Sequence, residues 1–163
     1  MKKILPVLGI ALFSLASCAS VTSMNDFYDK YDKQATVIPL PKFAVNLAKK
    51  TTDAKILEYI KSAKVFVISD AGKGKQNRVM RDLQTSTKGD NFEQMVKVKL
   101  KNSNVNASFL EKDGKVSNLI LGLNGLQNVL VIDSKVDLTR AQLDEAMENI
   151  DLSDLEGITD ILK

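Results

Sequence analysis

The stretch VNASFLEKDGKVSNLILGL, residues 105–123, joins two apolar runs through Asp113-Gly114. A two-residue Asp-Gly link between such runs is typical of a β-hairpin, because both turn residues must adopt a positive φ. The β-branched run Val129–Asp133 follows shortly afterwards and predicts one more strand. Together these segments predict a three-stranded antiparallel meander in the C-terminal part of the chain.

Further strand and helix patterns surround this meander. Alternating or β-branched runs predict strands, and apolar residues three or four positions apart predict helices. Strands are expected at residues 36–40, 64–69 and 96–101, and helices at 26–34, 43–50, 53–63 and 76–86, with a helical turn at 92–96. Such a mixture predicts an α+β fold: a mostly antiparallel sheet with helices packed on it, as a two-layer sandwich.

The last clear helix is expected to begin after Thr139. Thr139 and Gln142 have the spacing of a capping box, and Leu138 and Leu143 have the spacing of a hydrophobic staple. A final short helix is expected at residues 153–162.

Two segments of the meander are apolar at consecutive positions rather than at alternating ones. They are Leu119–Leu121 and Val129–Ile132. Strands of this kind are usually buried on both faces. We therefore expect them at the centre of the sheet, covered on both sides by helices or by a partner subunit.

The N-terminus carries the pattern of a bacterial lipoprotein signal. Lys2 and Lys3 precede an apolar segment that ends in Leu15-Ala16-Ser17-Cys18. This segment is shorter than the roughly 20 residues that span a bilayer, and its flanks are typical of a cleaved export signal. Cys18 is the sole cysteine of the sequence, so its thiol is expected to carry a lipid rather than a disulfide. A secretory signal with an incidental cysteine is the alternative.

This pattern divides the chain into three parts. Residues 1–17 are expected to be a lipoprotein signal peptide, residues 18–25 a lipidated tether, and residues 26–163 a single α+β domain. Ala19 and Ser20 follow the cysteine, in place of the aspartate that retains many lipoproteins in the inner membrane. The chain is therefore expected to be anchored in the outer membrane through N-terminal acyl chains and to face the periplasm.

The composition excludes several kinds of enzyme. The chain contains no histidine, which removes Ser-His-Asp and Cys-His catalysis and most zinc sites. A carboxylate-dependent hydrolase stays open as an alternative, with Asp144, Glu145 and Glu148 as the residues that would test it. A solvated acidic helix face is the simpler interpretation of these residues. We therefore expect no enzyme activity and no cofactor.

Two other segments have patterns that resemble ligand sites. Asp70–Lys75 is rich in glycine and lysine, but it lacks the spacing of a phosphate-binding loop. Asp151, Asp154 and Glu156 lack the spacing of an EF-hand calcium loop. The sequence therefore predicts neither a nucleotide site nor a metal site.

Lysines on two segments form a candidate basic contact surface. These are Lys73, Lys75, Lys97, Lys99 and Lys101. The simpler interpretation is a solvated basic turn for the first two and, for the others, a charged edge strand that discourages aggregation. An acidic partner or a lipid head-group surface is the alternative.

Charge is divided unevenly along the mature chain. Residues 18–132 carry 18 basic and 11 acidic side chains, whereas residues 133–163 carry 3 basic and 9 acidic ones. The simpler interpretation is that the acidic part packs against the basic body and partly neutralises it. Binding of anionic lipid or of a protein is the alternative. A nucleic-acid partner is not expected for an envelope protein.

A known family shares the order of several features of this chain. They are Phe92-Glu93-Gln94-Met95, the Asp-Gly hairpin, Val129–Ile132, and Val136-Asp137-Leu138 before a helix. With the lipoprotein signal in front, the chain resembles the small exported lipoproteins grouped as domain of unknown function 4252, over about residues 25–150. The resemblance implies a lipid-anchored single domain with a link to envelope signalling, and it brings no catalytic residues.

These observations predict a non-catalytic, lipid-anchored binding or signalling-accessory module in the periplasm. Its expected partners are the membrane, through the acyl chains, and a protein of the envelope. A surface or structural adhesion lipoprotein is the alternative, followed by the carboxylate-dependent hydrolase.

Overall fold

The computed structural model describes residues 21–42, 46, 55–99, 103–125 and 127–148. Its helices are α1 (Met24–Tyr31), the 3-10 turn η1 (Asp32–Gln34), α3 (Ile56–Tyr59), α4 (Lys73–Gly89) and α5 (Arg140–Glu148). Its strands are β1 (Thr36–Leu40), β2 (Ile60–Ile68), β3 (Glu93–Lys99), β4 (Ser103–Lys112), β5 (Lys115–Gly125) and β6 (Asn128–Thr139).

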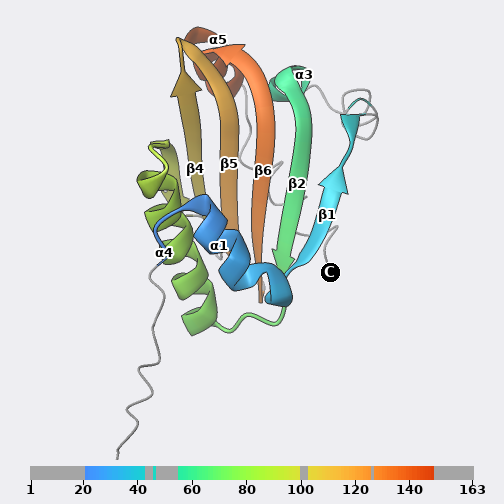
Figure 1. Ribbon diagram of the computed structural model, residues 1–163, viewed down its shortest axis with the longest axis vertical. Coiled ribbons are helices and arrows are strands. Elements are labelled where there is room, and N and C mark those ends of the chain that lie inside the picture. Colours follow the sequence, from blue (N-terminus) through green and yellow to red (C-terminus); the bar gives the residue numbers. More distant parts are fainter. Residues whose placement is uncertain (1–20, 43–45, 47–54, 100–102, 126, 149–163) are drawn as a thin grey trace, which may run out of the picture.

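The strands form one antiparallel sheet with the order β1-β2-β6-β5-β4-β3. The predicted meander is β4-β5-β6, and β5 and β6 lie at the centre of the sheet, as the sequence predicts. Helices α1 and α4 pack on one face of the sheet, and α3 and α5 lie behind it at one end (Figure 1). The predicted α+β sandwich is confirmed.

The hairpin between β4 and β5 has the predicted turn. Lys112 pairs with Lys115, and the two residues between them have positive φ angles, 55° at Asp113 and 75° at Gly114. Two successive positive φ angles define a type I′ turn, whose twist matches that of the flanking strands. This turn fixes the register in which β4 and β5 pair.

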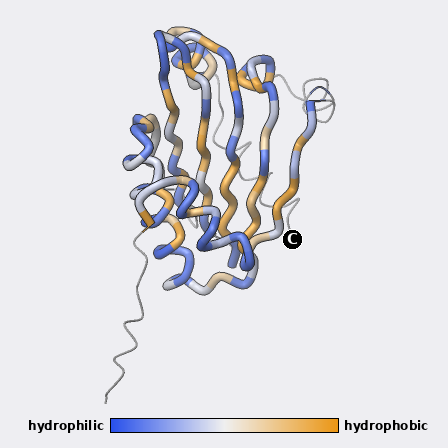
Figure 2. The backbone as a smooth tube through the Cα atoms, viewed as in Figure 1, coloured by the Kyte–Doolittle hydropathy of each residue, from blue (hydrophilic) through white to orange (hydrophobic). Residues whose placement is uncertain are grey.

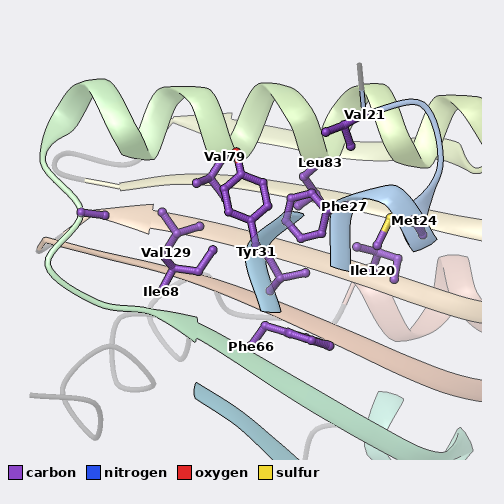
Figure 3. Packing of buried hydrophobic residues seen from close by; sticks show 12 residues of the cluster. Val21, Met24, Phe27, Tyr31, Phe66, Ile68, Val79, Leu83, Ile120 and Val129 are labelled. Atoms are coloured by element: carbon purple, nitrogen blue, oxygen red, sulfur yellow. The ribbon is translucent and has the colours of Figure 1, made fainter. Parts of the chain in front are cut away.

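The face of the sheet beneath α1 and α4, which we call the helical face, carries the larger core. Phe27 and Tyr31 of α1 are four residues apart, so they lie on one side of the helix and are buried together. They pack with Val79 and Leu83 of α4 above Ile120 of β5, as Figure 3 shows. Burial of each such side chain contributes about 1.5–3 kcal/mol.

The opposite face is closed at one end by α3 and α5. The predicted capping box is confirmed, because the Thr139 N–H donates to Gln142 Oε1 at 2.8 Å and the Gln142 N–H donates to Thr139 Oγ1 at 3.3 Å. Leu138 and Leu143 are both buried in one cluster with Phe109, as the predicted hydrophobic staple requires. The guanidinium of Arg140 lies 4.4 Å from the ring centre of Phe109.

Two helix predictions are wrong. The helix expected at 53–63 ends at Tyr59, because Ile60 begins β2, which pairs with β6 and, over most of its length, with β1. The helical turn expected at 92–96 is the start of β3, which pairs with β4. In both segments the apolar spacing fits a helix, but strand pairing supplies more hydrogen bonds and burial than an isolated helical turn.

Other boundaries differ less from the prediction. Helix α4 begins at Lys73, three residues before the expected start, and therefore includes Gly74. Strand β6 continues to Thr139, well beyond the expected Val129–Asp133. The helices expected at 43–50 and 153–162 fall largely or wholly outside the described residues.

Two alanine substitutions test the importance of the turn. Gly114 and Gly74 both have open space where a Cβ would stand, but Gly114 has a positive φ and Gly74 lies in a helix. Gly114→Ala is expected to lower the free energy of unfolding by about 1 kcal/mol, because an L-residue is strained there. Gly74→Ala is expected to raise it by up to about 1 kcal/mol. Urea denaturation measures both, and equal effects would contradict the prediction.

Candidate functional site

The first described residue before α1 is Val21, whose side chain is buried against the helical face. Just after it, the carboxylate of Asp26 accepts hydrogen bonds from the Thr22 N–H at 3.0 Å, the Thr22 hydroxyl at 2.8 Å and the Ser23 N–H at 3.0 Å. The hydrogen bond from the Thr22 backbone is the main reason why the pKa of Asp26 lies below its usual value. Ser23 in turn caps α1.

The end of α4 holds the same segment from the other side. The Met24 N–H donates to Asp90 Oδ2 at 2.8 Å. A Cβ on Gly89 would stand 1.8 Å from the Thr22 carbonyl oxygen, so only glycine permits this close approach. We call the contacts of residues 22–24 with Asp26, Gly89 and Asp90 the N-terminal clamp.

The N-terminal clamp corrects the expected extent of the tether. Residues 21–25 belong to the folded body, because Val21 and Met24 are buried and α1 begins at Met24. Of the expected tether, only residues 18–20 precede the described residues, and Cys18 lies among them. The reason is that the capping box and the contact with Gly89 fix a polar segment whose composition alone resembles a linker.

Helix α1 is also attached to its neighbours by two buried or half-buried tyrosines. The Tyr28 hydroxyl donates to Asp133 Oδ2 of β6 at 2.6 Å, and the Tyr31 hydroxyl donates to Asp82 Oδ2 of α4 at 2.8 Å. Burial, followed by these hydrogen bonds, raises the pKa of both tyrosines far above the usual value. Both phenols are therefore neutral donors that hold α1 in place.

Asp82 also receives a positively charged donor. Lys30 Nζ lies 2.6 Å from Asp82 Oδ2. Partial burial opposes the ionisation of Asp82, but the hydrogen bonds from Lys30 and Tyr31 outweigh it and hold the pKa of Asp82 below its usual value. This carboxylate is a structural contact between α1 and α4.

Helices α1 and α4 cover only part of the helical face. Beyond Ile120 of β5 and Asp133 of β6, no described helix lies over this face, and hydrophilic and hydrophobic residues alternate along the strand ends (Figures 1 and 2). Five exposed lysines from four strands lie on this uncovered half, which we call the lysine face: Lys61, Lys64, Lys112, Lys115 and Lys135.

The register of the strands brings these lysines together. Lys112 pairs with Lys115 across the β4–β5 hairpin, and Lys64 pairs with Asp133, two residues before Lys135 on the same strand. Residues two apart in a strand point to the same face. None of these five lysines is among the basic residues that the sequence singles out.

Asp137 connects two lysines of the lysine face. Its carboxylate lies 2.7 Å from Lys61 Nζ and 3.4 Å from Lys115 Nζ. The hydrogen bond from Lys61 is the largest cause of a pKa for Asp137 that lies below its usual value. Because all three side chains are solvent-exposed, the contribution of these pairs to stability is small.

The predicted basic contact surface lies toward the other end of the sheet. Lys73 and Lys75 are in the first turn of α4, next to the β5–β6 turn, since the Ala71 N–H donates to the Gln127 carbonyl oxygen at 2.7 Å. Lys97 and Lys99 pair with Asn106 and Asn104, near that same end. Lys101 lies outside the described residues. A contact role for these residues stays a prediction.

The carboxylates considered for hydrolysis lie on the outer surface of α5. Asp144 pairs with Arg140 Nε at 3.3 Å, and Glu145 pairs with Lys55 Nζ at 2.9 Å. Glu148 is exposed on the same helix. Among the described residues, no cluster of acidic or sulfur ligands could hold a metal ion. The three residues considered for calcium lie outside the described part.

Within the described residues 133–148, part of the acidic segment packs against the basic body. Asp137 and Glu145, from the acidic C-terminal part, form ion pairs with Lys61, Lys115 and Lys55 of the body. This agrees with the simpler interpretation of the uneven charge. Within the described part of the chain, no helix has the length and apolar character needed to cross a bilayer.

Gly89→Ala tests the N-terminal clamp. The new methyl group would overlap the Thr22 carbonyl oxygen, so we expect a loss of about 2 kcal/mol in the free energy of unfolding. Hydrogen exchange at the Met24 amide should become much faster, because this amide loses Asp90. Gly74→Ala is the matched control, and an unchanged Met24 amide would contradict the role assigned to Gly89.

The pH dependence of stability tests Asp82. A carboxyl whose folded pKa is lowered stabilises the protein above its unfolded pKa of about 3.9, and this contribution is lost as the pH falls through the folded pKa. Asp82→Asn should lower the free energy of unfolding by about 1–2 kcal/mol at pH 7 and flatten its decline below about pH 4. Asp29→Asn, at an exposed position of α1, should have much smaller effects in the same pH-dependent denaturation.

Comparison with known proteins identifies the family without naming an activity. The family described as Domain of unknown function (DUF4252) matches residues 28–146, which include every described strand and helices α3 and α4. No curated protein matches the chain. Because the match covers well over half of the sequence, this chain belongs to the DUF4252 family.

Proposed function

We propose that the chain is a lipid-anchored, non-catalytic binding module of the bacterial envelope, with a signalling-accessory role. Acyl chains on Cys18 would hold it in the outer membrane, facing the periplasm. The observation that carries the proposal is the position of the N-terminal clamp, whose first residue, Thr22, is four positions after Cys18 in the sequence.

This spacing keeps the folded body close to the bilayer. Between Cys18 and Val21 the chain can extend by at most about 11 Å. Two or more acyl chains give stable membrane attachment, whereas one chain gives only marginal binding. Because the N-terminal clamp holds residues 22–24 against α4, the sheet would stay within a short distance of the anchored Cys18.

Binding is favoured over catalysis by the roles of the polar groups. The chain has no histidine, and the tyrosines and aspartates that contact one another join α1 to the rest of the fold. Asp144 and Glu145 are engaged in ion pairs on an exposed helix surface. These observations support a module that presents surfaces to a protein of the envelope rather than one that transforms a substrate.

Mass spectrometry of the protein purified from membranes tests the anchor. We expect a mature chain that begins at Cys18 and carries a diacylglyceryl group, and we expect Cys18→Ser to leave the leader uncleaved and the thiol adduct absent. Ser20→Ala is the matched control and should be processed normally. An unmodified thiol in the mature wild-type chain would contradict the proposal.

Crosslinking in intact cells tests the partner. A photoreactive amino acid at exposed positions of the anchored protein should give a discrete adduct with an envelope protein. The same probe at the buried position of Phe27 is the control and should give none. Absence of an adduct from every exposed strand and helix would count against the binding role.

A further inference from the structure

We propose that the lysine face rests on the anionic phosphate head groups of the membrane in which Cys18 is anchored. This inference deepens the proposed function and rests on the lipid anchor. It assigns a contact surface to five lysines that come from β2, β4, β5 and β6.

The folded chain begins on the same face of the sheet as the lysines. Val21 and Met24 pack into the core of the helical face with Ile120 of β5 (Figure 3). Lys115 is five residues from Ile120 along β5, a distance of about 17 Å in an extended strand. The first described residues therefore lie on the same face of the sheet as the lysines.

The charge of this surface suits a phosphate-rich layer. Among the described residues, the five lysines stand against Asp133 and Asp137 on this surface and Asp113 at the tip of the β4–β5 hairpin, which leaves an excess of two positive charges. Asp133 accepts from Tyr28, and Asp137 lies between Lys61 and Lys115. Clusters of basic side chains next to a membrane anchor are attracted to anionic lipids over a distance of about one Debye length, roughly 10 Å.

The shape and the side-chain type favour lipid over a folded partner. The lysine face is one side of a sheet, and each lysine presents a hydrated point charge on a flexible stem. Such charges follow the phosphates of a fluid surface without fixed geometry, whereas a folded partner usually needs a central apolar contact. On β2, β4, β5 and β6 the exposed positions next to these lysines are polar or charged, whereas the edge strand β1 exposes Val37, Ile38 and Pro39, the last of which pairs with Lys64.

Lysine reactivity in vesicles tests the proposal. The protein purified from membranes is reconstituted in phosphatidylcholine vesicles, with or without about one-third phosphatidylglycerol, and treated with a membrane-impermeant acylating reagent. In the anionic vesicles, peptides containing the lysine face should be acylated at least about threefold more slowly, and high salt should restore the reactivity. Lys33 and Lys55, which are exposed elsewhere, should react equally in both.

Paired variants distinguish this contact from general adsorption. Lys112→Gln with Lys135→Gln should reduce the protection of Lys61, Lys64 and Lys115. The control pair Lys33→Gln with Lys55→Gln, which removes the same charge, should leave this protection intact. Equal reactivity of the lysine face in vesicles with and without phosphatidylglycerol would overturn the inference. An acidic protein would then be the better candidate to bind this surface.

The same sample separates this inference from the proposed function. The mass of the Cys18 peptide shows whether Cys18 carries its lipid, independently of lysine labelling. A lipidated Cys18 with no protection of the lysines would overturn only the contact with head groups. Protected lysines on a protein whose Cys18 is not lipidated, through adsorption to anionic vesicles, would overturn only the lipid anchor.

Discussion

The fold depends on the burial of β5 and β6, which are apolar on both faces. Ile120 and Val131 pack beneath α1 and α4, whereas Leu123 and Leu130 are buried on the opposite face. A strand of this kind is stable only at the centre of a sheet with cover on both sides, because apolar area left in water costs free energy. The shorter β1, which contains Pro39 as its fourth of five residues, is confined to an edge.

The same strands are longer than the helices that cover them. β6 has 12 residues and reaches about 40 Å, whereas the 17 residues of α4 reach about 25 Å. On the helical face, β6 therefore changes from buried Val129 and Val131 to exposed Lys135 and Asp137. The uncovered half of the sheet results from this difference in length, and exposed lysines lie on it.

Helix α1 connects the sheet to the N-terminus. The buried ring of Phe27 packs α1 against the sheet. The hydroxyl of Tyr28 bonds α1 to β6, and the hydroxyl of Tyr31 bonds it to α4. The N-terminal clamp then positions the chain where it leaves the folded body. If Cys18 carries the proposed anchor, α1 and the N-terminal clamp connect it to the sheet that carries the lysine face.

The sequence by itself determined the features that depend on neighbouring residues: the Asp113-Gly114 turn, the Thr139 cap and the apolar central strands. It failed at residues 60–63 and 92–96, where one short apolar run fits both a helix and a strand. It also missed the N-terminal clamp, because Gly89 and Thr22 are far apart in the chain. The lysine face could not be predicted, since its residues come from four strands. Only the tertiary structure decided these features, because strand register and helix packing bring distant residues together.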